Sequence, residues 1–264
     1  MSDDSVLLDI SDGIATITLN EPDRRNALSE SIEAGMLDAL DEISESDASC
    51  VVIEGSGGAF SAGGDIERML EGLTGDVPLD DRAKALEDGT PQTLTEVYQY
   101  HLPTIAKIDG PAVGAGANLA IACDVQLASE AASFGFVFRQ VGLSVDAGTS
   151  YLLPRLVGLN VAKELVFTGD IIDAERAAEI GLVNHVYDSN EFDDEVQAVA
   201  ERIASGPDVA FRHTKRLLNE GFEKSIEQAM TDEAVAQGIV FQTDDHREGV
   251  EAFMESRKPE FEGE

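Results

Sequence analysis

The sequence IDGPAVGAGANLAIACDVQLAS, at residues 108–129, decides the fold. A predicted strand, TIAKI at residues 104–108, leads into a turn made almost entirely of small residues. Residues 118–122 then have the apolar composition of a short helix, and DVQLAS is the next predicted strand. Strand, turn, helix and strand in this order are typical of an α/β protein with parallel strands.

A second glycine-rich turn, FSAGGDI at residues 60–66, has the same design. It follows a predicted buried strand at residues 50–54 and leads into IERML, which starts a helix. Helix N-termini carry unpaired N–H groups with partial positive charge, so two such turns side by side would direct donors at one oxygen. Neither turn fits a phosphate loop, because no Gly-Lys-Ser/Thr follows and GxGxxG is absent. The alternative is that these glycines only permit tight packing.

The beginning of the chain predicts a hairpin and a helix. Residues 6–10 and 14–19 flank an Asp-Gly pair, whose glycine supplies the positive φ of a tight turn. Ser29 is a suitable N-cap for the periodic apolar pattern that runs to about residue 46.

The rest of the chain divides into a loop-rich middle and a helical end. Residues 72–90 are polar and unpatterned, which favours a surface loop with some helix, and residues 94–101 are helical. After Thr149, helices are predicted at residues 152–157, 161–168, 174–180, 192–204, 209–219, 226–237 and 244–254. We therefore predict an α/β core at residues 1–205 and a helical C-terminal region at residues 206–264.

The charge of the chain is strongly acidic: 52 Asp and Glu against 18 Lys and Arg give a formal net charge of -34 over 264 residues. The acids are spread along the whole chain. They could face a basic partner, but we favour a solvated surface suited to concentrated salt, which screens charge repulsion, and thus a halophilic protein. No basic stripe exists that would release counterions, so no nucleic-acid partner is expected.

Hydrophobic residues make up 43% of the chain, which favours a folded globular protein. Cys50 and Cys123 sit in apolar runs, and no Cys/His cluster suggests zinc or another metal. No apolar run is long enough to cross a membrane, and the acidic start lacks a signal-peptide core. We expect a cytoplasmic protein with no membrane partner.

Several further motifs accompany the two turns: NALS at 26–29, GLSVDAGTSYLLPRLVG at 142–158, TGDIIDAERAAEIGLVNHV at 168–186 and REGVEAFMESRKPEF at 247–261. With them the sequence resembles the crotonase, or enoyl-CoA hydratase/isomerase, superfamily over nearly its whole length. Within that superfamily, VDAGTSYLLPR looks most like isomerases of the phenylacetate-degradation type.

The resemblance implies a fold, an assembly and a substrate class. The fold is α/β, with a crotonase-like spiral core of ββα units and a helical C-terminal trimerisation region. The assembly is a homotrimer, or a hexamer built as a dimer of trimers. The substrate is an acyl-CoA thioester, so coenzyme A is part of the substrate and no metal or redox cofactor is needed.

By motif position, the resemblance implies that the thioester oxygen accepts hydrogen bonds from the backbone N–H groups of Gly64 and Ala115. Such an oxyanion hole stabilises the enolate that forms when a proton leaves the neighbouring carbon, and losing one donor typically costs about 3–4 kcal/mol. Further contacts with the substrate or its CoA moiety are implied for Arg24, Arg25, Ala27, Ala62, Asp65, Ile66, Asn118, Phe138 and Phe253.

The acidic residues near these turns indicate which reaction of the superfamily the chain can catalyse. Hydratases of the superfamily use two glutamates, but Asn118 and Phe138 occupy those positions here, and neither can act as a general base. Asp146 is the one acid left in this part of the sequence, and an apolar pocket would raise its pKa. A single carboxylate suits a double-bond isomerase, because it can take a proton from one carbon and return it to another.

Asp146 has two alternative roles. It could be the N-cap of the following helix. It could also be a nucleophile, as in dehalogenases of the superfamily, which additionally need an upstream histidine; His101 is the nearest one and is misplaced for that role.

Three functions remain open in the sequence. The favoured one is an enoyl-CoA isomerase that uses Asp146 as acid and base. The first alternative is an enoyl-CoA hydratase of fatty-acid β-oxidation, with its acid supplied from elsewhere, for example residues 72–90. The second is a non-catalytic CoA-binding subunit. RNA binding, known in some crotonase relatives, is disfavoured by the net charge of -34.

The oxyanion hole predicts the effect of one substitution. Gly64→Val places a bulky side chain where the backbone must approach the thioester oxygen, so we expect turnover of an acyl-CoA substrate to be abolished. Steady-state kinetics measure this, and normal activity in the variant would contradict the assignment of Gly64.

Overall fold

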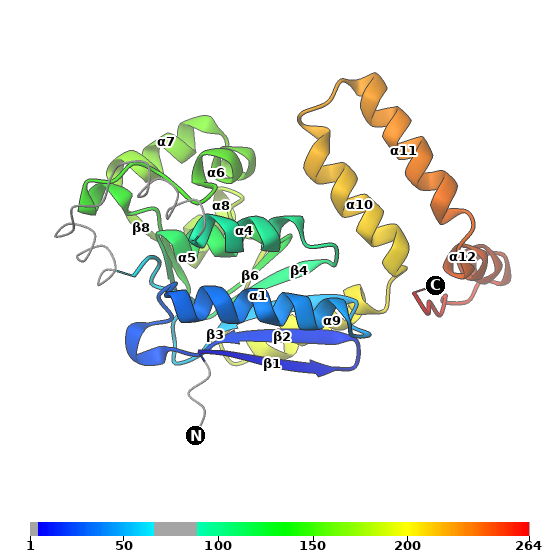
Figure 1. Cartoon of the computed structure of the whole chain (residues 1–264), viewed down its shortest axis with the longest axis horizontal. Helices are drawn as coiled ribbons and strands as arrows, with labels where there is room; N and C mark the ends of the chain where they lie inside the picture. The colour runs from blue at the N-terminus through cyan, green and yellow to red at the C-terminus, as the bar shows by residue number, and fades with distance from the viewer. Residues whose placement is uncertain (1–4, 66–88, 264) are drawn as a thin grey trace.

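The computed structural model describes residues 5–65 and 89–263, and two sheets organise them (Figure 1). The larger sheet has the order β1-β2-β3-β4-β6-β9, in which only the β1–β2 pair is antiparallel. Its strands are β1 Val6–Ser11, β2 Ile14–Leu19, β3 Cys50–Gly55, β4 Thr104–Ile108, β6 Val125–Ser129 and β9 His185–Tyr187. The smaller sheet contains β5 Pro111–Val113, β7 Ser133–Gly135 and β8 Ile171–Asp173. The predicted α/β architecture with parallel strands is confirmed.

The helices follow the predicted order along the chain. They are α1 Glu30–Ser44, α4 Thr90–Gln99, α5 Ala115–Ala122, α6 Thr149–Val157, α7 Leu159–Thr168, α8 Ala174–Glu179, α9 Phe192–Ala204, α10 Asp208–Gly221, α11 Ile226–Val240 and α12 Asp244–Glu255, with short 3-10 turns η1 Pro22–Arg24 and η2 Phe138–Val141. Ser29 caps α1 as predicted, its Oγ accepting from the Ile32 N–H at 3.3 Å. The predicted hairpin is also confirmed, and both of its turn residues, Asp12 and Gly13, have positive φ.

The prediction of an almost entirely helical chain after Thr149 was wrong at two places. β8 and β9 each have three residues and lie between helices in this region. The alternation of apolar and polar residues that identifies a strand needs at least four residues to be recognised. For the same reason, the sequence did not predict β5 or β7.

Helices cover both faces of the larger sheet. Ala15 and Ile17 pack in one cluster with apolar residues of α1, whereas Ile14 and Val52 pack in a second cluster with α9. This division follows from the strand geometry, since successive side chains point to opposite faces. The sheet is therefore buried on both sides, and its carboxyl-end loops remain the places where a site can form.

The C-terminal helices α10–α12 lie away from the two sheets (Figure 1). Lys215 holds α10 to the core: its ammonium group lies 2.7 Å from the Asp124 carboxylate and donates to the Leu102 carbonyl at 2.9 Å. Much of the apolar surface of these helices has no cover in the single chain, and Phe222 and Phe253 are 77% and 83% exposed. Exposed apolar surface of this extent is uncommon in proteins that stay monomeric.

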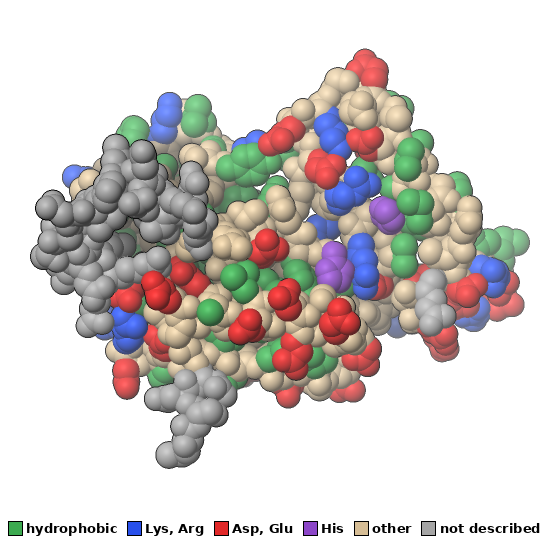
Figure 2. All heavy atoms as spheres, viewed as in Figure 1, with side chains coloured by type: hydrophobic (Ala, Val, Ile, Leu, Met, Phe, Trp, Pro, Cys, Tyr) green, Lys and Arg blue, Asp and Glu red, His purple; other side chains and the backbone are tan. Residues whose placement is uncertain are grey.

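Acidic side chains dominate the face shown in Figure 2, as the composition predicts. The hollow between the core and α10 differs, because basic side chains gather beside it, among them Arg212, His213 and Arg216. None of the helices that the structure describes is long and apolar enough to cross a membrane.

Candidate active site

The two glycine-rich turns contact each other through their backbones. The Val113 N–H donates to the Ser61 carbonyl at 2.9 Å. A Cβ on Gly63 would lie 2.4 Å from the Val113 carbonyl oxygen and 3.1 Å from the Ala115 nitrogen, and a Cβ on Gly116 would lie 2.4 Å from the Ser61 oxygen. A side chain at either glycine would force the backbones apart. The two turns are therefore side by side, as the sequence pattern predicts.

This contact brings the Gly64 and Ala115 segments together. Ala115 is the first residue of α5, where N–H groups have no partner within the helix. Among the described residues, neither the Gly64 N–H nor the Ala115 N–H donates a hydrogen bond. The neighbouring groups are used: the Gly63 carbonyl accepts from Leu28 N at 2.7 Å, and the Gly114 N–H donates to Gly135 O at 2.7 Å. Two unpaired donors near a helix N-terminus suit an oxyanion.

Asn26 shapes the segment expected to contact CoA, a role that the sequence did not reveal. Its side chain is fully buried; Nδ2 donates to the Ser56 and Ala59 carbonyls, both at 2.8 Å, and Oδ1 accepts from Glu21 N at 3.0 Å. Arg25 and Asn26 both have positive φ, 52° and 54°. Asn tolerates this conformation better than most residues, which is the sequence signal that could have identified it.

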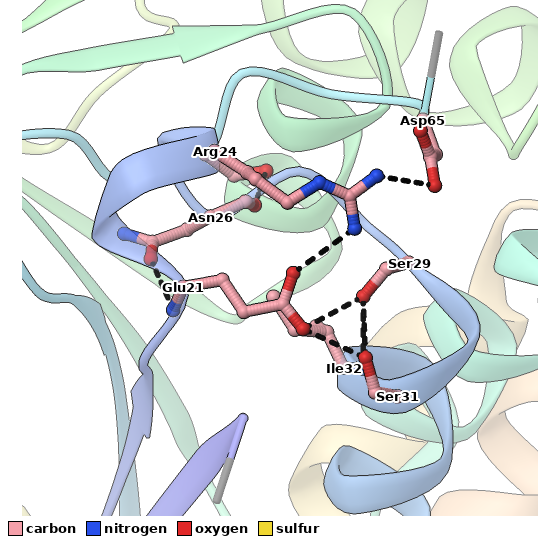
Figure 3. A network of polar contacts seen from close by, with 8 residues as sticks. Glu21, Arg24, Asn26, Ser29, Ser31, Ile32 and Asp65 are labelled. Atoms are coloured by element: carbon pink, nitrogen blue, oxygen red, sulfur yellow. Dashed lines mark hydrogen bonds and ion pairs between the residues drawn. The ribbon is translucent and has the colours of Figure 1, made fainter. Parts of the chain in front are cut away.

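Arg24 joins this segment to the glycine-rich turn at residues 60–66 through Asp65 (Figure 3). Its guanidinium lies 2.7 Å from Asp65 and 3.4 Å from Glu21. Glu21 also accepts hydrogen bonds from Ser29 at 3.1 Å and Ser31 at 2.7 Å; although burial opposes the shift, these bonds and Arg24 lower the pKa of its carboxyl. Two predicted contact residues, Arg24 and Asp65, are thus placed together at one edge of the site.

The backbone completes this arrangement around Ala27 and Ala62, two further predicted contacts. Ala62 N donates to the carbonyl of Arg25 at 2.9 Å, and Leu28 pairs with Gly64 in a short parallel bridge. The segment at residues 24–28 therefore runs beside the glycine-rich turn at residues 60–66.

The two positions where hydratases carry glutamates hold side chains that cannot donate or accept a proton for catalysis. Asn118, on α5, is fully buried; its Nδ2 donates to the Asp146 carbonyl at 3.2 Å, and its Oδ1 accepts from Thr149 at 2.8 Å. Phe138, at the start of η2, is buried in the main apolar cluster. The amide of Asn118 thus donates one hydrogen bond and accepts another inside the chain.

Asp146 lies on the turn that precedes α6. The N-cap of α6 is Gly148, so the alternative interpretation of Asp146 as the helix cap was wrong. Its carboxylate has no hydrogen-bond or ion-pair partner among the described residues. The side chain is accessible to solvent in the single chain, but the surrounding atoms still raise the pKa of the Asp146 carboxyl through desolvation. A free carboxylate of raised pKa is suited to act as a general base.

A cavity of about 930 Å³ opens beside this turn, between α4, α6 and α10. Ala147 and Gly148 line it, together with His101, whose ring packs on Tyr100 with the centroids 4.7 Å apart. Burial, followed by the charge of Arg212, lowers the pKa of His101.

Some predicted site residues are not brought together with the turns. Phe253 is on α12, at the opposite end of the molecule from α5, and is almost fully exposed (Figure 1). Ile66 and most of the expected loop at residues 72–90 lie outside the described residues; the described part resumes at residue 89, and α4 begins at Thr90. In the described part of the chain, no cluster of His, Cys, Asp and Glu could hold a metal ion.

Comparison with known proteins identifies the family. The sequence profile of the enoyl-CoA hydratase/isomerase family matches residues 9–264. The chain belongs to this family, and it is an enzyme of the crotonase superfamily.

Relatives in this family carry names of both activities. "Crotonyl-CoA hydratase" of Syntrophomonas wolfei is 35% identical over 265 residues, which cover 99% of each chain. "1,2-epoxyphenylacetyl-CoA isomerase" of Escherichia coli is 30% identical over 259 residues and 98% of each chain. The crystal structure of an enoyl-CoA hydratase from Bacillus anthracis superposes with a TM-score of 0.90 at 31% identity, covering 98% of this chain and 100% of the other. The crotonase-like fold expected from the sequence is therefore confirmed.

The contacts of Asn26 predict a double effect of its removal. Asn26→Ala leaves the Glu21 N–H and the carbonyls of Ser56 and Ala59 without their partner, so we expect the free energy of unfolding to fall by about 3 kcal/mol. The KM for an acyl-CoA should rise, because the segment at residues 24–28 loses its support. Denaturant unfolding and kinetics measure the two effects.

The matched control is Asn190→Ala, which removes the exposed hydrogen bond from Asn190 Nδ2 to Asp188 and keeps the one donated by the Asn190 backbone N–H. It should change neither quantity appreciably. A destabilised Asn26→Ala enzyme with an unchanged KM would contradict the role of Asn26 in shaping the site.

Proposed function

We propose that the protein is an enoyl-CoA isomerase, which moves a double bond in an acyl-CoA thioester with Asp146 as acid and base. The observation that carries the proposal is the carboxylate of Asp146, unpartnered among the described residues. It stands on a turn bonded to α5, the helix whose first N–H belongs to Ala115. The absence of acids at positions 118 and 138 supports isomerisation over hydration.

The reaction needs two proton transfers and no change in oxidation state. The thioester oxygen accepts hydrogen bonds from the N–H groups of Gly64 and Ala115, which stabilise negative charge as it develops. The carboxylate of Asp146 takes a proton from one carbon of a 3-enoyl-CoA and forms a dienolate. It then returns the proton to another carbon and is regenerated as a carboxylate. This scheme uses no metal or redox cofactor.

Hydration remains the alternative function, supported by the name of the Syntrophomonas wolfei relative. It requires an acid or base that activates water. Asn118 and Phe138 offer none, and Phe138 makes its surroundings apolar. A hydratase would therefore need a group from another part of the chain.

We further propose that residues 206–264 assemble the enzyme into a homotrimer or a dimer of trimers. The support is the exposed apolar surface on α10–α12, since a monomer rarely leaves such a surface open to water. Phe253, which is remote from α5 in its own chain, would then contact the CoA of a neighbouring subunit.

The net charge of -34 supports a further proposal, that the enzyme works in the cytoplasm of a halophilic organism. At ordinary ionic strength, 52 acidic side chains on one chain repel each other and favour expansion. Salt at molar concentration shortens the screening length to about 3 Å and removes most of this repulsion.

The catalytic role of Asp146 predicts a pH dependence. The base is the ionised carboxylate, so kcat for a 3-enoyl-CoA falls as the pH drops through its pKa, which desolvation raises above the ordinary value of an aspartate. Asp146→Asn should lose about 10³-fold in kcat and lack this acidic limb. Product analysis on 3-enoyl-CoA and 2-enoyl-CoA checks the reaction: full isomerase activity in the variant, or fast formation of 3-hydroxyacyl-CoA by the native enzyme, would contradict the proposal.

The charge predicts a salt-dependent stability. Raising KCl from about 0.1 M to about 1 M should increase the free energy of unfolding by at least about 2 kcal/mol, because screening relieves repulsion in the compact state. A parallel series in sucrose, which stabilises by exclusion without screening charge, is the control. Equal stabilisation in the two series would contradict the electrostatic explanation.

A further inference from the structure

The turn that carries Asp146 is held in an unfavourable backbone conformation. Ala147 has a φ of 45° and Gly148 a φ of 82°, so two successive residues are left-handed. For a residue with a Cβ this conformation is disfavoured, and it persists where surrounding contacts enforce it. Ala147 is also buried, which leaves the turn little freedom to relax.

The enforcing contacts converge on the carbonyl oxygen of Asp146. It accepts from the Thr149 N–H at 2.9 Å and from Asn118 Nδ2 at 3.2 Å, and the Thr149 hydroxyl lies 2.8 Å from it. The same hydroxyl lies 2.8 Å from Asn118 Oδ1. Since a hydroxyl has a single proton, it is shared between these two acceptors.

Both residues that make these contacts are buried: Asn118 is fully buried, and Thr149 is 1% exposed. Nδ2 and Oδ1 of the Asn118 amide thus each have a partner inside the chain, and the two bonds fix the orientation of the side chain. The amide connects α5 to the turn before α6. The helix α5 begins at Ala115, whose N–H is a proposed oxyanion donor. About one turn later, the same helix carries Asn118, which holds the carbonyl of Asp146.

We propose that Asn118 and Thr149 are positioning residues, which hold the Asp146 turn and thereby set the place of its carboxylate relative to the oxyanion donors on α5. This inference rests on the proposed function. Neither residue touches the substrate; both act through Asp146. A displacement of about 1 Å in a catalytic group can cost about 100-fold in rate, so loss of this support should appear in kcat.

Thr149 offers the sharper test, because two substitutions separate its hydroxyl from its shape. Thr149→Val is nearly isosteric and removes the hydroxyl, whereas Thr149→Ser keeps it. Each variant is made in the native enzyme and in Asp146→Asn, and isomerisation of trans-3-hexenoyl-CoA is followed at saturating and limiting substrate. Thermal unfolding is measured for every variant. Thr168→Val is the control, because it removes an exposed hydroxyl that donates to the Glu164 carbonyl and accepts from the Asp170 N–H, and neither bond involves the turn.

We expect Thr149→Val to lower kcat by about 10- to 100-fold with little change in KM, and Thr149→Ser to retain most of the native kcat. In the Asp146→Asn background, Thr149→Val should cause no further loss, because its effect passes through the missing carboxylate. Asn118→Leu removes the Nδ2 donor at nearly constant size without adding an acid. It should repeat this pattern and is the second variant if Thr149→Val does not fold.

Two results would overturn the inference while leaving the proposed function intact. One is an equal loss of kcat in Thr149→Val and Thr149→Ser. The other is a further loss, by the same factor, when Thr149→Val is added to Asp146→Asn, since a merely structural residue would act independently of the base. Native-like turnover in Asp146→Asn alone would instead overturn the proposed function, and the positioning role with it.

Discussion

The backbone contact between the two glycine-rich turns is the constraint on which the rest of the site depends. The turns can approach only because Gly63 and Gly116 have no side chain, since a Cβ at either position would lie 2.4 Å from a carbonyl oxygen of the other turn. The contact places the start of α5 against the turn that follows β3. It also determines which backbone N–H groups remain unpaired at that point, and these are the donors that the proposed function assigns to the thioester oxygen.

The helix α5 connects this backbone contact to the turn that carries Asp146. Ala115 at its first residue belongs to the contact, and Asn118 one turn later holds the Asp146 turn. A related enzyme with glutamate at that position would place a carboxylate where this chain places a structural amide. The substitution therefore does two things at once: it removes an acid, and it supports another acid close by. Under the proposed function, this arrangement is the physical reason to expect proton transfer rather than the addition of water.

The parts of the fold that the sequence predicts best are those with long periodic patterns. The hairpin, the helix capped by Ser29 and the C-terminal helices all have enough residues for their apolar period to be recognised. Strands of three residues, such as β8, have no such period. At the site, Gly64, Ala115 and Asp146 were identified by motif, and the structure brings their segments together. Asn26 and Thr149 were not, because their roles come from contacts with segments far along the chain or on another helix.

The central claim is that the two turns polarise a thioester carbonyl, and the vibration of that carbonyl tests it most directly. Isotope-edited infrared spectra of trans-3-hexenoyl-CoA, labelled with ¹³C at the thioester carbon and bound to the slow Asp146→Asn enzyme, isolate this one stretch. If the N–H groups of Gly64 and Ala115 both donate to the oxygen, the C=O bond weakens and the stretch moves to lower frequency than in water. A bound thioester whose carbonyl frequency equals that in water would contradict the account.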